Sequence, residues 1–302
     1  MDCSITDDFI PVTTADIDLL ETFLKKAGYE ECNHNIVNFY MWYKPYPLWK
    51  LVQKNYVLIL GIHEGVFFLY MPLCEKQYFR EAIRKAAGIF SHYQMPFVLS
   101  CFIKEEIDLV LQEFPGHTAI SFRDSADYVY FTEKLRTFSG KKLQKKRNHL
   151  NAFYREQEGH WQYEELNSTN IPEVKKFLES WKPDEDDPVL ADEREGAFTV
   201  LDLYEKLPAK GGVIRLDGQV KAFIIASRLS ERMCQINIEK ADAGVRGLYQ
   251  AILKEFLQRN FTDTLYVNRE DDMGNQNLRQ AKMAYYPEYL IYKYRLREEE
   301  NF

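Results

Sequence analysis

Short runs of apolar residues separated by turn residues predict a β-hairpin in each half of the chain. In the first half, two such runs flank the glycine-containing turn 61–65. In the second half they flank Asp217-Gly218, a dipeptide typical of tight hairpins. The predicted strands are 56–60 and 66–70, then 212–216 and 220–225.

Each hairpin is followed by a predicted amphipathic helix. Apolar residues recur every three or four positions over 77–92 and again over 245–259, so each helix has one apolar face. Each helix leads into a further strand, at 96–100 in the first half and at 264–268 in the second. The same succession of elements therefore appears twice.

A second helix and a late strand complete the pattern in both halves. In the second half these are 275–284 and 289–294. The order β-β-α-β-α-β occurring twice predicts two copies of one α/β unit, with a coincidence of generic elements as the alternative. We expect domains at 1–135 and 136–302, the second entered through a basic helix at 141–156.

The composition is typical of a globular protein. The 302 residues are 46% hydrophobic and 28% charged, and this length accommodates two domains with proper cores. No apolar run approaches the roughly 18 residues that a membrane span needs. The acidic N-terminus lacks the pattern of a signal peptide, and the five scattered cysteines fit reduced thiols. We expect a cytoplasmic protein with no membrane span.

Several common catalytic sites are absent from the sequence. It contains no Gly-x-Gly-x-x-Gly motif after a strand, no Walker loop and no Gly-x-Ser-x-Gly elbow. The six histidines show no zinc-type spacing with one another or with cysteine. We therefore expect no metal site, no nucleotide hydrolysis and no serine hydrolase chemistry.

A basic segment stands out against the net charge of −7. Residues 133–155 hold eight lysines and arginines and the single acid Glu133. Lys146 projects within the apolar stripe of the predicted helix and Arg147 lies on its flank. Because an unpaired buried charge is unfavourable, this position predicts an anionic partner, such as a phosphate of RNA or of a cofactor. Pairing with the acidic segment 184–195 is the alternative. The candidate phosphate- or RNA-binding residues are Lys142, Lys146 and Arg147.

The loop 241–247 leads from a strand into a helix and contains Gly244 and Gly247. Such a loop presents free backbone N–H groups to a ligand, and Arg246 adds a positive charge, so it is a candidate site for a pyrophosphate or carboxylate. The alternative is an ordinary turn in which Asp242 caps the helix.

The segment 268–282 places many polar residues at the end of a strand, where α/β sheets usually bind ligands. Arg279 and Lys282 share a helix face and are candidates for holding a phosphate, while Tyr286, beside Pro287, is a candidate for the wall of a cleft. The alternative is that the acids and bases of this segment pair with one another.

The motifs themselves resemble those of a known family. They are Ser139-Gly140-Lys141-Lys142 with 146–151, then 268–274, 277–282, and Tyr286-x-x-Tyr289 around Pro287. The pattern is similar to that of a bacterial family of uncharacterised proteins related to the C-terminal domain of phosphatidylglycerol lysyltransferase, over nearly the whole chain. The resemblance implies two tandem GNAT-like (N-acetyltransferase-like) α/β (α+β) domains, each with a mixed, mostly antiparallel sheet flanked by helices.

The resemblance also implies transfer of an aminoacyl group from aminoacyl-tRNA to an amine or hydroxyl of a small molecule, peptide or lipid headgroup. In acyl transfer, Glu239 or Glu270 can serve as the base. The candidate catalytic residues are Glu239, Glu270 and Asn268, and the candidate substrate-binding residues are Arg246, Gly247, Tyr249, Arg269, Asp271, Arg279, Lys282 and Tyr286.

Two other functions remain open from the sequence. One is a coenzyme A-dependent N-acyltransferase with acyl-CoA as donor, although Gly244 and Gly247 do not match the Gln/Arg-x-x-Gly-x-Gly/Ala spacing of standard acetyltransferases. The other is a non-catalytic module that binds RNA or protein through the basic helix and the many tyrosines.

Overall fold

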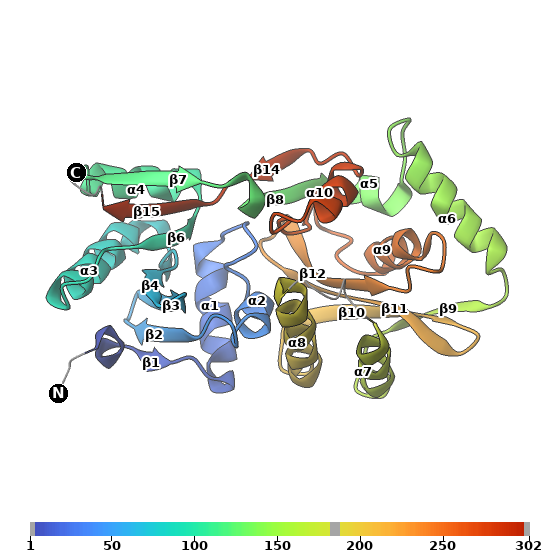
Figure 1. The fold of residues 1–302 in the computed structure, drawn as a ribbon, viewed down its shortest axis with the longest axis horizontal. Coiled ribbons are helices and arrows are strands. Elements are labelled where there is room, and N and C mark those ends of the chain that lie inside the picture. Colours follow the sequence, from blue (N-terminus) through green and yellow to red (C-terminus); the bar gives the residue numbers. More distant parts are fainter. Residues whose placement is uncertain (1–3, 182–187, 299–302) are drawn as a thin grey trace. The chain divides into compact units, whose positions relative to one another are not determined.

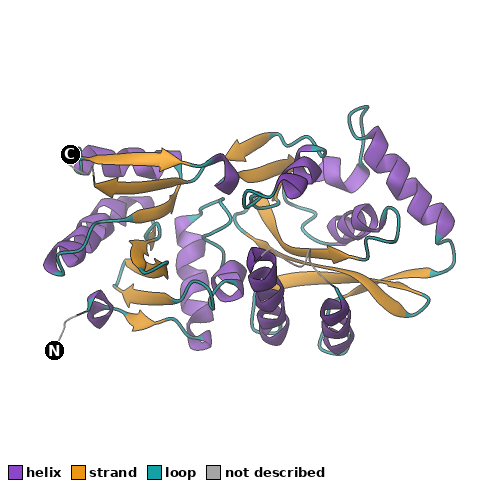
Figure 2. Cartoon of the chain, viewed as in Figure 1, coloured by secondary structure: helices purple, strands orange, loops and turns teal. Residues whose placement is uncertain are grey.

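The computed structural model describes residues 4–181 and 188–298. The chain forms two compact units, one of Asp127–Leu290 and one of the residues before and after that segment. In the described residues, no helix has the length and apolar character of a membrane span. Figure 1 follows the chain through both units, and Figure 2 shows its helices and strands.

Unit 1 holds a mixed sheet with strand order β1-β2-β3-β4-β6-β15-β7, and β5 pairs with β3. Its strands are β1 (Ile10–Pro11), β2 (Leu48–Val52), β3 (Tyr56–His63), β4 (Val66–Leu69), β5 (Leu73–Cys74), β6 (Leu99–Phe102), β7 (His117–Ser121) and β15 (Tyr294–Glu298). Its helices are α1 (Ile17–Ala27), α2 (Ile36–Met41), α3 (Phe79–His92) and α4 (Lys104–Glu113), with short 3-10 helices at Ile5–Asp8, Thr14–Asp16, Lys76–Tyr78 and Arg123–Ser125.

Unit 2 holds the sheet β14-β8-β13-β12-β11-β10-β9. Its strands are β8 (Asp127–Phe131), β9 (Trp161–Glu165), β10 (Ala209–Leu216), β11 (Gln219–Arg228), β12 (Met233–Ala241), β13 (Tyr266–Asn268) and β14 (Tyr289–Ile291). Its helices are α5 (Thr132–Thr137), α6 (Gln144–Glu156), α7 (Ile171–Ser180), α8 (Pro188–Leu203), α9 (Leu248–Arg259) and α10 (Gln276–Met283).

The division differs from the predicted domains 1–135 and 136–302 at both ends of the second domain. β8 belongs to unit 2 because it pairs antiparallel with β13. β15 belongs to unit 1 because it pairs antiparallel with both β6 and β7. The late strand expected at 289–294 is accordingly two strands in two different sheets. Strand pairing between residues far apart in sequence decides both differences.

Strand β11 shows why unit 2 forms a sheet covered on both faces. Successive side chains of a strand point to opposite faces. Ala222 and Ile224 belong to the buried core that also contains α9. The alternate residue Phe223 contacts the ring of Phe177 from α7. A strand buried on both faces has few polar positions, and the predicted run 220–225 is accordingly apolar at every position except Lys221.

Helix α6 begins later than the predicted 141. Its first residue is Gln144, and the preceding turn contains Phe138 and Gly140, both with positive φ. The guanidinium of Arg147 donates hydrogen bonds to the carbonyls of Phe138 (2.5 Å) and Gly140 (3.1 Å). These bonds stabilise the turn that delays the helix.

Strands β12 and β13 separate after a short parallel pairing. The register runs from Met233–Tyr266 to Gln235–Asn268 and then stops. Next to this point the register between β11 and β12 shifts, so that Asn237 has no opposite residue. In the described chain, the rest of β12 therefore has no strand partner on its β13 side. We call the space between this rest of β12 and the segment that follows β13 the wedge.

We expect Gly247→Ala to lower the free energy of unfolding strongly. Gly247 has φ +81°, and a Cβ there would lie 2.1 Å from the carbonyl oxygen of His149 on α6. Gly218 has a similar φ of +79° with nothing within 4 Å of its Cβ position, so Gly218→Ala is the matched control. A residue with a side chain is strained at a positive φ, so we expect the control to lose about 1 kcal/mol of the free energy of unfolding. In Gly247→Ala the overpacking against His149 is added, so we expect a loss of roughly 3 kcal/mol. Urea denaturation measures both, and equal losses contradict the packing argument.

Candidate functional site

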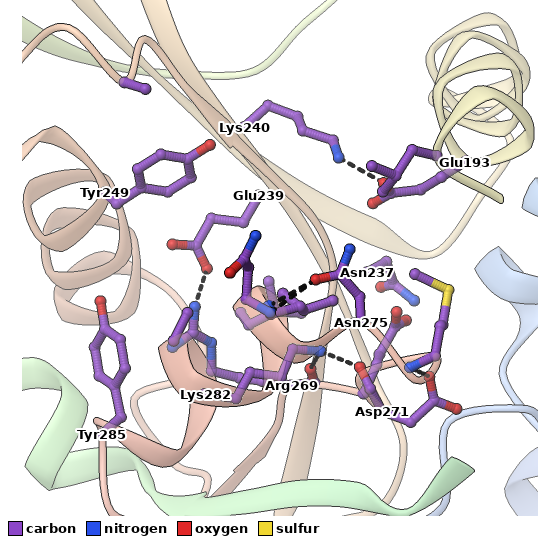
Figure 3. Close-up of a pocket in the computed structure, with 18 of the residues that line it drawn as sticks. Glu193, Asn237, Glu239, Lys240, Tyr249, Arg269, Asp271, Asn275, Lys282 and Tyr285 are labelled. Atoms are coloured by element: carbon purple, nitrogen blue, oxygen red, sulfur yellow. Dashed lines mark hydrogen bonds and ion pairs between the residues drawn. The ribbon is translucent and has the colours of Figure 1, made fainter. Parts of the chain in front are cut away.

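A pocket of about 590 Å³ lies in unit 2, at the wedge between β12 and β13 (Figure 3). β12 supplies one wall with Ile236, Asn237, Glu239 and Lys240. The segment after β13 and helix α10 supply the opposite wall, and residues of α6 and α9 complete it. A concave site of this size accommodates a small molecule or the reactive end of a larger one.

Half of the predicted site residues line this pocket. Those in its wall are Lys146, Glu239, Tyr249, Arg269, Glu270, Asp271 and Lys282. Those that lie outside its wall are Lys142, Arg147, Arg246, Gly247, Asn268, Arg279 and Tyr286. The strand end at 268–271 therefore contributes to the pocket, whereas the loop 241–247 contributes Ala243 alone.

Glu239 and Arg269 form a buried ion pair across the wedge. Arg269 Nη2 lies 2.7 Å from Glu239 Oε2, and the side chains are 12% and 8% exposed. Burial by itself lowers the pKa of Arg269, but the Glu239 carboxylate and the hydroxyls of Tyr285 and Tyr130 raise it above its ordinary value. The guanidinium therefore stays charged.

Each partner of this pair has one atom left over. Glu239 Oε1 and Arg269 Nη1 are buried and have no hydrogen-bond partner in the described structure. Buried polar atoms are nearly always satisfied, so two such atoms in one pocket wall indicate a place for a polar ligand. The pocket offers it one acceptor on Glu239 and one donor on Arg269.

The loop between β13 and α10 is held by a second buried ion pair. The side chain of Asp272 is fully buried and accepts hydrogen bonds from Arg279 Nε (2.8 Å) and Nη2 (2.7 Å) and from the Tyr128 hydroxyl. Lys282 Nζ donates to the backbone carbonyls of Arg269 (2.7 Å) and Asp271. Arg279 and Lys282 thus both fix the loop. Arg279 does so by pairing with an acid of the same segment, as the alternative predicted, whereas Lys282 bonds backbone carbonyls.

Asn268 lies behind the pocket wall. Its side chain is buried, donates to Asp127 at 2.9 Å, and accepts from the backbone N–H of Glu270 at 2.7 Å. Glu270 has a positive φ of 58°, which turns the chain sharply after β13. Asn268 therefore positions Glu270, whose carboxylate accepts a hydrogen bond of 2.6 Å from Gln235.

The loop 241–247 is closed by its own residues. The backbone N–H of Gly244 donates to Asp242 Oδ1 at 2.9 Å, and Asp242 also pairs with Lys221 at 3.0 Å. The close approach of His149 occupies the space beside Gly247. Arg246 is exposed. This geometry matches the alternative of an ordinary turn, but Asp242 does not cap the helix as predicted. The residue before α9 is Gly247, and no side chain caps that helix, because Asp242 is bonded within the loop and to Lys221.

The basic residues of the 138–147 region have separate surroundings. Lys142 is exposed and lies 5.4 Å from the ring centre of the exposed Tyr286. Arg147 fixes the turn before α6. Lys146 alone of the three reaches the pocket wall. Residues 184–187 of the acidic segment considered as their partner lie outside the described residues.

Sequence reasoning missed the part of the pocket built by Lys240, by Trp181 and by α8. Lys240 Nζ lies 2.7 Å from Glu193 of α8 and 4.2 Å from the ring centre of Trp181, which follows α7. The available signal was Glu239-Lys240, two adjacent charges in a strand whose neighbours are apolar. The sequence contains no signal that brings Trp181 and Glu193 to them.

We expect Asp272→Asn to destabilise the protein in a pH-dependent manner. Burial by itself raises the pKa of Asp272, but the bonds from Arg279 and Tyr128 outweigh it and lower the pKa from 3.8 to about 2. A lowered pKa stabilises the fold above the unfolded-state value, here on the order of 2 kcal/mol at neutral pH, and this stabilisation is lost as pH falls from 4 to 2.

The measurement is urea denaturation of the wild type and Asp272→Asn between pH 7 and pH 2.5. Lys175→Met, which removes an exposed ion pair to Asp202, is the control and should change little. A difference between Asp272→Asn and the wild type that stays constant down to pH 2.5 contradicts the assignment.

Solved structures share the whole architecture. A protein of unknown function from Bacteroides thetaiotaomicron is 25% identical, with 96% of this chain and 99% of that one covered and a TM-score of 0.89. L-PGS from Bacillus licheniformis is 15% identical, with 94% and 92% covered and a TM-score of 0.66. FemX shows the same fold at 8% identity, with 95% and 96% covered and a TM-score of 0.61. The predicted fold class, two tandem GNAT-like α+β domains, is confirmed.

Sequence comparison gives the same relationship. An uncharacterised protein of Mycoplasmoides gallisepticum is 31% identical over 180 residues, a match that covers 58% of this chain and 57% of that protein. The chain thus matches a little over half the length of this curated relative. The family model for the C-terminal region of phosphatidylglycerol lysyltransferase matches residues 25–297. The chain belongs to the phosphatidylglycerol lysyltransferase C-terminal family, as its motifs predicted, and has an acyltransferase-type fold.

Proposed function

We propose that the unit 2 pocket transfers an aminoacyl group from aminoacyl-tRNA to an amine or hydroxyl acceptor. The observation that carries this proposal is the buried Glu239–Arg269 pair, which leaves one acceptor atom and one donor atom in the pocket wall. Family membership supports the reaction class, because the family takes its name from phosphatidylglycerol lysyltransferase.

The two atoms suit the reactive end of an aminoacyl ester. The α-ammonium of an aminoacyl group is a donor that Glu239 Oε1 can accept. The ester carbonyl oxygen is an acceptor for Arg269 Nη1, and it gains negative charge as the acceptor attacks. A donor fixed in a pocket that excludes water stabilises that charge strongly, which is the main electrostatic contribution to acyl transfer.

The outer surface of the same unit offers a place for the tRNA. Lys141, Lys142 and Lys145 are exposed at the start of α6, and Lys142 lies over Tyr286. Exposed cations beside an aromatic ring suit a nucleic acid, because they contact phosphates and a base stacks on the ring. We propose this surface as the site for the phosphates near the charged end of the tRNA.

We expect Glu239→Gln to lower aminoacyl transfer by about 10²-fold, because the variant weakens both the contact with the ammonium and the placement of Arg269. The assay follows loss of a radiolabelled aminoacyl ester from bulk charged tRNA. The acceptors are phosphatidylglycerol vesicles, a short peptide with a free amino terminus, and glycerol.

The matched control is Glu255→Gln. Glu255 is also buried and paired, with Arg259 at 2.5 Å and with the Tyr154 hydroxyl, but it lies outside the pocket wall. This control should keep the transfer rate even if it unfolds more easily. Wild-type protein that transfers nothing to any acceptor contradicts the proposed function, and an unchanged rate in Glu239→Gln contradicts the site.

Coenzyme A is expected to leave the melting temperature unchanged at millimolar concentration. The loop that holds its pyrophosphate in standard acetyltransferases is closed here by Asp242 and by the backbone of His149. A ligand that binds only the folded state raises the melting temperature by mass action. A shift of several degrees would favour the coenzyme A-dependent reaction instead.

A further inference from the structure

The cations of the pocket wall differ in what they contact. Arg269 is paired with Glu239. Lys240 is paired with Glu193, and Lys282 donates to two backbone carbonyls. Lys146 has no hydrogen bond or ion pair within the described residues, although it lines the same pocket. Its amine is therefore available to a substrate.

The Lys146 amine contacts an aromatic ring face, and no acid lies at contact distance from it in the described residues. Its side chain is half-buried at the start of α6, with Nζ 4.1 Å from the ring centre of Tyr285. The hydroxyl of Tyr285 accepts a hydrogen bond from Gln250 at 2.8 Å, which fixes the ring. A cation over an aromatic face is attracted by the ring, but far less strongly than by a carboxylate.

The charges that surround Lys146 favour its neutral form. Burial, and after it the positive charges of Arg269 and Lys145, lower the pKa of Lys146 to about 8, although the Glu239 carboxylate opposes them. His149, one turn along α6, is half-buried, and its own pKa is lowered by burial and by the cations around it. With this pKa, roughly a tenth of Lys146 is an unprotonated amine at pH 7 and about half of it at pH 8.

We propose that Lys146 is the general base of the transfer reaction. This inference rests on the proposed function. The neutral Nζ takes the proton from the attacking hydroxyl or amine while the acceptor atom bonds to the ester carbonyl carbon. The ester C–O bond then breaks, and the Lys146 ammonium gives the same proton to the departing ribose oxygen of the tRNA. One proton moves through one nitrogen, so the step balances without any co-reactant.

The two carboxylates considered as bases are less suited to this step. Glu239 is held by Arg269, and Glu270 accepts a hydrogen bond from Gln235. Both carboxylates already have a partner, whereas the Lys146 nitrogen contacts only a ring face and has a pKa of about 8, close to the pH at which a base has to work. We therefore assign Glu239 to holding the donor and Lys146 to proton transfer.

The first experiment measures the kinetics of Lys146→Met, in which the aliphatic stem can still pack on Tyr285. We expect kcat to fall by about 10²- to 10⁴-fold with KM little changed, because only the proton transfer is lost. Ethylamine in the buffer should restore part of the rate. In the wild type, the rate should rise from pH 6, reach half of its maximum near pH 8 and level above about pH 9, as Lys146 becomes neutral.

Lys146→Arg distinguishes two possible roles of Lys146, a base for proton transfer and an anchor for a phosphate. Arginine keeps the charge but stays protonated, so a base is lost and an anchor is kept. We expect Lys146→Arg to be as inactive as Lys146→Met and to be insensitive to ethylamine. The control is Lys254→Met, which removes another half-buried lysine over a tyrosine ring, 5.3 Å from the ring centre of Tyr154 but outside the pocket wall, and should keep the pH profile of the rate.

A second measurement tests Lys146 without any substrate. Brief labelling with acetic anhydride between pH 6 and pH 11, read by peptide mass spectrometry, should show Lys146 reaching half of its maximum reactivity near pH 8. An active Lys146→Arg, or a Lys146→Met rate within twofold of the wild type, overturns the assignment while the proposed function stands. A wild type that transfers nothing overturns both.

Discussion

β13 pairs with β12 only from Met233 to Gln235 and then ends, and the pocket lies where β12 continues without it. Had the pairing continued, the backbone of one strand would occupy the space in which Glu239 and Arg269 now meet. The register shift at Asn237 lies on the opposite side of β12 and bends the strand where the separation begins. The wedge is thus a consequence of how few hydrogen bonds link these two strands.

The wedge keeps a fixed geometry for a ligand only if both of its walls are rigid. On the β13 side, the loop after Asn268 has no strand to hold it, and buried polar bonds do so instead. Asp272 binds Arg279 and Tyr128, and Lys282 binds two carbonyls of the same loop. These contacts place the Arg269 side chain across from Glu239. The residues of this segment therefore work in two layers, one that fixes the loop and one that faces the pocket.

The surroundings of the parallel strand pair in unit 1 differ from those of the parallel pair in unit 2. β4 and β6 share the single register pair Leu69–Leu99. Around it the chain places buried aromatic rings: Tyr70 packs edge-on against His34, with ring centres 5.5 Å apart, and Phe68 covers Gly61. The duplicated fold thus carries an aromatic cluster in one copy and a polar pocket in the other.

The sequence alone predicted the two hairpins, the helices that follow them and the segment that supplies one pocket wall, and its motifs predicted the fold class through the family resemblance. Apolar periodicity and the Asp217-Gly218 turn are local signals, so hairpins and helices could be predicted from neighbouring residues. It also predicted that a cation at Lys146 lies on the packed side of its helix. Only the tertiary structure decided which charges are already paired. Arg279 meets Asp272 and Arg147 meets the carbonyls of its own turn, whereas Lys146 meets a ring face. The exchange of β8 and β15 between the halves was likewise decided by pairing between distant residues. Such contacts depend on where the sheet brings each strand, and no local pattern encodes that.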